Sequence, residues 1–312
     1  MADIYSLVIG LFLFKNEFNS YREKFLKFTY IFIFLYLLVS IALSSFAGLL
    51  NPIESILNGG RFLLLSKPTD GHSVLNEIAS LGLIFLLCKK NKEKNFIFKV
   101  LFFIVMLILA KSMTSILCLF AILTIYLFEN LRLKDQVKNF IHVLLISLTA
   151  IFFSNQERMN DFLYFARGNI VGQDVDVYYG DYSAGRNDLN RLLIYYANES
   201  PLFGVGNEHP VLKYGVTIES GAEKGATSES PLRLATQYGW VLFLITVLIN
   251  LLPLIAGFCI KKHRLFFILV GYAIIVLGGT NAGFSVPQSN LYIFFGPIVW
   301  LAWFSIKKKY FN

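Results

Sequence analysis

Charged residues are scarce in this chain, since Asp, Glu, Lys and Arg make up 15% of its 312 residues while 56% are hydrophobic. Soluble globular domains carry about 25% charged residues, and the mean hydropathy of +0.60 sets this chain apart from them. Its apolar runs approach the length needed to cross about 30 Å of hydrocarbon. Such runs must be helical, because lipid offers the backbone no hydrogen-bond partner. We therefore expect an all-α, polytopic integral membrane protein.

Cysteine is also rare. Cys88, Cys118 and Cys259 lie in apolar runs, without CxxC pairing or metal-type spacing to His or acidic residues. We interpret them as core residues and expect neither a metal nor a cofactor.

Residues 1–14 lack the basic start and the small-residue cleavage pattern of a signal peptide, so we expect the spans themselves to direct targeting. The chain has no internal repeat or low-complexity tract, and residues 1–312 are expected to form a single membrane domain.

The net charge of +8 is distributed in short basic clusters between apolar runs, which argues against a nucleic-acid partner. Under the positive-inside rule these clusters mark cytoplasmic ends; they occupy residues 15–27, 89–94, 132–138, 261–264 and 307–309. The predicted spans are residues 28–50, 74–88, 96–110, 113–128, 140–153, 232–260, 265–280 and 291–306. Residues 4–14 are apolar but short, so the count is eight, or nine with this segment. Residues 155–229 then form one large loop on the outer side.

The loop contains a predicted helix. Ser183 suits its N-cap, the helix begins near Gly185, and the sequence Glu199-Ser200-Pro201 ends it, because proline disfavours helical geometry in the residue before it. At 100° per residue, Arg186 lies at the edge of the apolar stripe and Arg191 on another side. The stripe itself consists of Leu189, Leu192, Leu193 and Tyr196, with Ala197 also at its edge.

Several loop residues have both a chemical and a structural interpretation. Arg186 is a candidate to bind a pyrophosphate through the paired donors of its guanidinium group, or it is a snorkelling surface arginine. Gly204 and Gly206 permit a tight turn and a close approach of the backbone to a neighbour or a ligand. His209 is a candidate ligand of sugar or phosphate and a candidate proton acceptor, or is simply solvated.

Glu229 precedes a predicted helix start, with Ser230 as N-cap and Pro231 at the first helical position. Its carboxylate could accept a proton from an attacking hydroxyl or stabilise the helix dipole. Arg61, Lys67 and Lys111 fall on the same outer side in this topology. They are interfacial anchors or, together with Arg186, they line an electropositive outer vestibule.

Two segments, one within the loop and one that begins at its end, carry a resemblance to a known family. Gly185-Arg186 and Arg191-Leu192 precede Pro201–Gly206, and residues 229–240 then read ESPLRLATQYGW. In this order the segments resemble the O-antigen polymerase and ligase superfamily of bacterial envelopes. The resemblance covers residues 183–244, with a looser echo at residues 60–76 and at Lys111-Ser112.

The resemblance implies a metal-independent, inverting glycosyltransferase in the bacterial inner membrane. Its donor would be an undecaprenyl-diphosphate-linked saccharide, used on the periplasmic face. Arg186 falls on the family's loop arginine thought to engage the pyrophosphate, and its neighbour Arg191 is expected to assist it. Ligases usually have a histidine where this chain has Ser228, followed by Glu229, so the polymerase branch is favoured, with Glu229 as the candidate base and His209 as a less secure substitute.

The expected catalytic residues are therefore Arg186 and Glu229. The expected substrate-binding residues are Arg191, His209, Arg61, Lys111, Gly204 and Gly206. A chain-length regulator is a candidate partner, beside membrane lipid. Three alternatives stay open: an O-antigen ligase acting on lipid A-core, a transporter for a lipid-linked sugar, and a structural or assembly subunit. The low charge of the spans argues against the transporter, which would need ionisable residues along its pathway.

Overall fold

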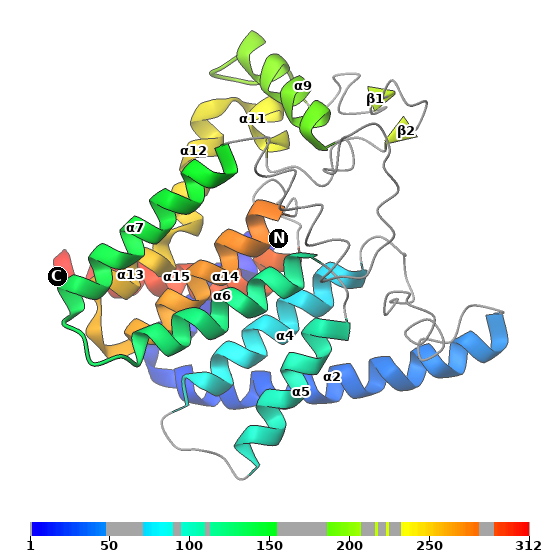
Figure 1. Cartoon of the computed structure of the whole chain (residues 1–312), viewed down its shortest axis with the longest axis vertical. Helices are drawn as coiled ribbons and strands as arrows, with labels where there is room; N and C mark the ends of the chain where they lie inside the picture. The colour runs from blue at the N-terminus through cyan, green and yellow to red at the C-terminus, as the bar shows by residue number, and fades with distance from the viewer. Residues whose placement is uncertain are drawn as a thin grey trace. The chain divides into compact units, whose positions relative to one another are not determined.

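The computed structural model describes residues 2–47, 71–89, 95–109, 113–154, 186–206, 216–217, 223–224, 232–280 and 290–311. Apart from short turns and two strands, these residues are helical, and the all-α class is confirmed (Figure 1). The strands β1 (Val216–Thr217) and β2 (Glu223–Lys224) form a short antiparallel pair. The helical elements are α1 (Ala2–Phe12), η1 (Leu13–Glu17), α2 (Phe18–Ala47), α4 (Gly71–Leu87), α5 (Phe96–Leu109), α6 (Met113–Glu129), α7 (Asp135–Ser154), α9 (Arg186–Glu199), α11 (Arg233–Tyr238), α12 (Trp240–Asn250), α13 (Leu252–Cys259), η3 (Lys261–His263), α14 (Arg264–Thr280) and α15 (Asn290–Tyr310).

The helices follow the predicted apolar segments closely, with one clear exception. Residues 232–260 were expected to form one continuous helix, but the structure divides them into α11, α12 and α13. Gly239 ends α11 at a φ of 89°, a conformation that residues with a side chain rarely adopt. Pro253, in the first turn of α13, has no N–H to donate to the carbonyl four residues earlier. The prediction of a single helix was therefore wrong.

Taken one at a time, none of the helices in the described part of the chain is both long enough and apolar enough to cross a bilayer. Together, α12 and α13 meet that test as a pair bent by 42°.

The described residues fall into two compact units, and each is considered by itself. The first comprises residues Met1–Tyr126, Ile249–Gly279 and Pro287–Asn312. Within it, α1 packs along α15, and α4 packs against α2, α5 and α15. Gly10 permits the close approach of α1, because a Cβ atom there would lie 2.4 Å from the Cβ of Trp300. The indole of Trp300 also donates to the hydroxyl of Ser6, 3.1 Å away.

The core of the first unit is centred on α4. Every residue from Glu77 to Leu87 is buried, and the Phe85 ring packs against those of Phe25 and Phe266. The hydroxyl of Ser80 lies 3.3 Å from the thiol of Cys118 on α6. Cys118 is fully buried, as predicted, whereas Cys88 and Cys259 are partly exposed.

The second unit comprises residues Leu127–Leu248 and Thr280–Val286. It contains the end of α6, helices α7, α9 and α11, most of α12, and the β1–β2 pair. Helices α9 and α11 pack against each other (Figure 1). This unit therefore carries the described parts of both segments on which the family resemblance rests.

Candidate functional site

Helix α9 forms where the sequence predicted a helix in the loop. It begins at Arg186 and ends at Glu199, and Ser200 and Pro201 continue into a turn. The bounds agree with the predicted start near Gly185 and with the predicted end before the proline. Arg186 therefore occupies the first position of the helix, at the positive end of its dipole.

One face of α9 is buried. Leu193 and Ala197 have no exposed surface, while Leu192 and Tyr196 are partly exposed. Leu193 packs with Val205 and Leu232 in a small hydrophobic core. The predicted apolar stripe is confirmed at these positions. The side chains of Arg186, Arg191 and Leu189 lie outside the described side chains, so the predicted position of Arg186 at the edge of this face stays a prediction.

The turn after α9 is held by backbone hydrogen bonds. The amide of Gly204 donates to the carbonyl of Ser200, 2.8 Å away, which closes the turn. Val205 and Gly206 then donate to the carbonyls of Thr236 and Gln237 on α11, at 2.8 and 3.2 Å. The turn is thus fixed to the last residues of α11.

The two glycines of this turn have different surroundings. Both have positive φ angles, 70° at Gly204 and 79° at Gly206. A Cβ atom on Gly204 would lie 2.3 Å from the carbonyl carbon of Gln237, whereas one on Gly206 would meet no atom within 4 Å. Of the two interpretations left open by the sequence, Gly204 shows the close approach to a neighbouring backbone. A role of either glycine in substrate binding stays a prediction.

Helix α11 is the other half of this arrangement. Leu234, Ala235, Thr236 and Gln237 are all buried. The hydroxyl of Thr236 donates to the carbonyl of Leu193 on α9, 3.0 Å away. The indole of Trp240, just after α11, donates to the side-chain oxygen of Asn198 at 2.9 Å. Side-chain and backbone hydrogen bonds therefore join α9, the turn and α11 into one unit, which we call the α9–α11 platform (residues 186–206 and 232–240).

The start of α11 was predicted at Pro231, and the described helix begins at Arg233, with Leu232 already in a helical conformation. The predicted cap at Ser230 and Pro231 lies outside the described residues. The same holds for five candidate site residues and for the serine that distinguishes the polymerase branch. These are Arg61, Lys67, Lys111, His209 and Glu229, together with Ser228. The predicted convergence of Arg61, Lys67 and Lys111 with Arg186 on one vestibule therefore stays a prediction.

A buried acidic residue in α4 was not identified from the sequence. The side chain of Glu77 is 3% exposed, and its Oε2 atom has no hydrogen-bond partner in the described part of the chain. A single carboxylate in an apolar run is a signal of function in a membrane protein, and it could have been found in residues 74–88. Glu77 belongs to the first unit, so it is not assigned to the α9–α11 platform.

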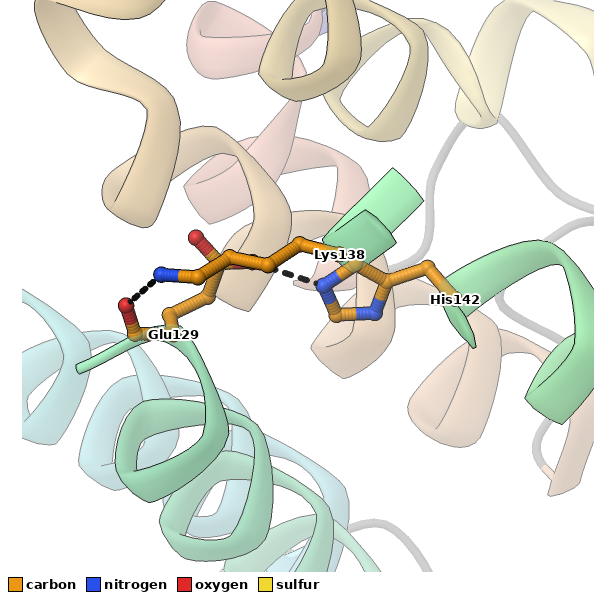
Figure 2. Close-up of polar contacts among 3 residues, drawn as sticks. All are labelled: Glu129, Lys138 and His142. Carbon is orange, nitrogen blue, oxygen red and sulfur yellow. Dashed lines mark hydrogen bonds and ion pairs between the residues drawn. The ribbon is translucent and has the colours of Figure 1, made fainter. Parts of the chain in front are cut away.

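The connection between α6 and α7 holds a polar cluster, which Figure 2 shows. The Nε2 atom of His142 lies 2.8 Å from Oε1 of Glu129, and both side chains are almost completely buried. The ammonium group of Lys138 donates to the main-chain carbonyl of Glu129. That carbonyl is among the last of α6, which have no partner within the helix. These contacts join the last residue of α6 to the first turns of α7.

A groove between α2 and α5 offers space in the first unit. Its volume is about 480 Å³, and its lining consists of Tyr30, Phe34, Asn95, Phe98, Lys99 and Phe102. One cation among aromatic rings is a poor match for a diphosphate, which needs several donors. Among the described residues, no group of three or more His, Cys, Asp and Glu side chains is arranged to hold a metal.

Comparison with models of known families, with curated proteins and with solved structures found no significant match.

Proposed function

We propose that this chain is a polymerase of O-antigen or a related surface polysaccharide. It would transfer undecaprenyl-diphosphate-linked glycan onto another lipid-linked repeat unit. The observation that carries the proposal is the α9–α11 platform. The two segments that resemble the polymerase and ligase superfamily are separated in sequence, yet they pack together through Thr236, Leu193 and the glycine turn.

The proposed setting is the inner membrane of a bacterium, crossed by eight or nine helices, with residues 155–229 as a periplasmic loop. Two observations support it. The described residues of the predicted spans are helical apart from Cys88, Leu232, Gly239, Leu251 and Ile260. Large apolar side chains are exposed on α5, α7 and α12, including Phe98, Phe140 and Leu244. Such surfaces need a hydrophobic environment.

Arg186 is the proposed pyrophosphate ligand. An arginine presents paired donors that match phosphate oxygens and does not lose its charge. Its place at the first position of α9 adds the favourable field of a helix N-terminus for an anion. Arg191, Arg61, Lys111 and His209 are proposed to complete the binding of the donor.

The proposed reaction is a single displacement at the anomeric carbon of the donor. An acceptor sugar hydroxyl attacks this carbon, Glu229 accepts the hydroxyl proton, and the bond from the carbon to the diphosphate oxygen breaks. The electron pair leaves with undecaprenyl diphosphate, whose added negative charge the arginines stabilise. The new glycosidic bond has the inverted configuration. The protein groups involved need no metal for these steps.

The decisive experiment is incubation of the purified full-length protein with labelled lipid-linked repeat unit. Products of two or more repeats on the lipid carrier are expected. If the labelled unit remains single, or crosses a membrane unchanged, the proposal is wrong and an assembly or transport role replaces it.

The ligase alternative is distinguished in cells. Loss of a polymerase leaves single repeat units on lipid A-core, whereas loss of a ligase leaves bare core and glycan on the undecaprenyl carrier. We expect the first pattern in a deletion strain, and the second would contradict the assignment to the polymerase branch.

A further inference from the structure

The tip of the turn after α9 is apolar and exposed. Leu202 is 62% exposed and Phe203 is 82% exposed. Tight turns at a water-exposed surface usually carry Gly, Pro, Asn, Asp or Ser. Two large apolar side chains at such a tip lose the free energy that burial would provide, so their exposure calls for a nonpolar neighbour.

The exposure of this tip is built into the fold. Gly204 closes the turn onto Ser200, and Trp240 donates its amide to the carbonyl of Pro201, 2.8 Å away. A Cβ atom on Gly239 would lie 2.4 Å from the carbonyl oxygen of Leu202, so the two backbones are in close contact there. The backbone carrying Leu202 and Phe203 is therefore held from both sides, and it directs these side chains away from the hydrophobic core around Leu193.

The tip lies against the start of an apolar helix, because the backbone of Leu202 contacts Gly239. Tyr238 and Trp240 lie at the junction between α11 and α12, and α12 then exposes Val241, Leu242, Leu244, Ile245 and Leu248. A helix that is apolar on several exposed faces is typical of a lipid environment. Trp240 turns its indole N–H to Asn198, and tryptophan and tyrosine are enriched at the membrane–water interface.

We propose that Leu202 and Phe203 insert into the lipid at the membrane interface from which α12 departs. The tip would then hold the α9–α11 platform at the level of the lipid headgroups. This inference concerns the same site as the proposed function and rests on it for one point, that the diphosphate of a lipid-linked donor lies at this level. The occupant is the lipid of that leaflet, because the backbone of the tip contacts Gly239, and α12, which begins at the next residue, exposes large apolar side chains.

The first test measures access from water in the full-length protein reconstituted in vesicles. Cys88, Cys118 and Cys259 are replaced by alanine, and Phe203→Cys is compared with Glu199→Cys, an exposed position at the end of α9. In Phe203→Cys, Leu202 is the large apolar side chain left at the tip. Its burial in lipid favours the inserted tip over the withdrawn tip by about tenfold. A membrane-impermeant maleimide reaches only the withdrawn tip, so residue 203 should react about tenfold more slowly than residue 199. Equal rates would overturn the proposal.

The second test keeps the native cysteines. In Phe203→Trp, bromine-labelled phospholipids should quench more fluorescence than in the unsubstituted protein, and labels near the headgroup should quench better than labels deep in the acyl chains. Leu248→Trp, within α12, should respond best to the deep labels. If Phe203→Trp fluorescence is instead quenched by soluble iodide and protected by added glycan, the tip binds sugar and the lipid proposal is wrong.

These readouts do not depend on glycan transfer. A protected tip in a protein that makes no polymer would retain this inference and refute the polymerase. Polymer formation by a protein with a freely reactive residue 203 would do the reverse.

Discussion

The hydroxyl of Thr236 on α11 donates to the main-chain carbonyl of Leu193 on α9, 3.0 Å away. Both residues are fully buried, and Leu193 belongs to the small core that also contains Val205 and Leu232. The bond joins two helices that are distant in sequence. Substitution of either Thr236 or Leu193 should therefore destabilise the whole α9–α11 platform.

Substitution Thr236→Val tests this bond. It preserves the shape of the side chain and removes its donor, so we expect the free energy of unfolding to fall by about 1 kcal/mol. The measurement is thermal or chemical unfolding of the purified protein. Thr246→Val is the matched control, because Thr246 donates to the carbonyl of Leu242 within α12 at an exposed position, where about 0.5 kcal/mol or less is expected. Equal losses in the two variants would contradict the prediction.

The glycines of the turn form a second matched pair. Gly204→Ala places a Cβ atom 2.3 Å from the Gln237 backbone at a φ of 70°. The strained conformation and the clash should together cost about 2–4 kcal/mol. In Gly206→Ala the added Cβ atom meets no other atom within 4 Å, so only the positive φ angle lowers the free energy of unfolding, by about 1–2 kcal/mol. Glycan polymerisation should fall with stability, and a Gly206→Ala protein less stable than Gly204→Ala would refute this account.

Substitution of Glu129 tests how much the Glu129–His142 pair contributes to the stability of the protein. Glu129→Ala leaves the buried imidazole without its acceptor, and a loss of about 3 kcal/mol in the free energy of unfolding is expected. Glu129→Gln retains an oxygen acceptor and should lose about 1 kcal/mol. If Glu129→Gln proved less stable to unfolding than Glu129→Ala, the pair would not stabilise the α6–α7 connection.

Arg186 is the most direct test of the proposed chemistry. Removal of a group that stabilises transition-state charge typically costs about 10²–10³-fold in rate, and we expect this loss of chain elongation in Arg186→Ala. Arg186→Lys should be intermediate, because it keeps the charge without the paired donors. Arg132→Ala removes an exposed charge in the α6–α7 connection and serves as the control, with normal elongation at equal protein levels. A normal glycan ladder in Arg186→Ala would remove this arginine from the mechanism.

Substitution Glu77→Leu tests whether the buried carboxyl group lowers the stability of the protein. A buried carboxyl oxygen without a described partner costs roughly 1–3 kcal/mol relative to an apolar group, so Glu77→Leu should raise the midpoint of thermal unfolding. The measurement is a melting curve, read together with chain elongation. A lower midpoint would mean that the Glu77 carboxyl makes stabilising interactions.

Much of the helical framework could be predicted because local composition determines it. The apolar runs 96–110, 113–128 and 265–280 coincide closely with α5, α6 and α14. The end of α9 could be predicted from Pro201, which acts on the residue just before it, whereas the predicted capping serine, Ser183, lies outside the described residues. The break between α12 and α13 was missed because hydrophobicity continues through it, although Pro253 was a local signal.

The polar contacts between helices could not be predicted in the same way. The sequence does not show that Thr236 faces Leu193, that Gly204 meets Gln237, or that His142 reaches Glu129, because helix packing brings these partners together. Glu77 had a local signal, but its burial depends on the helices packed around α4.

The sequence by itself determined the helical class, the position of the loop helix and the candidate arginine at its start. Those features depend on side-chain hydrophobicity, on capping and on proline, which act over a few residues. Only the tertiary structure decided that α9, the glycine turn and α11 form one platform, and that Leu202 and Phe203 stand exposed at its tip. The packing of two distant segments requires the burial of Leu193 and hydrogen bonds between backbones, and these interactions exist only once the chain has folded.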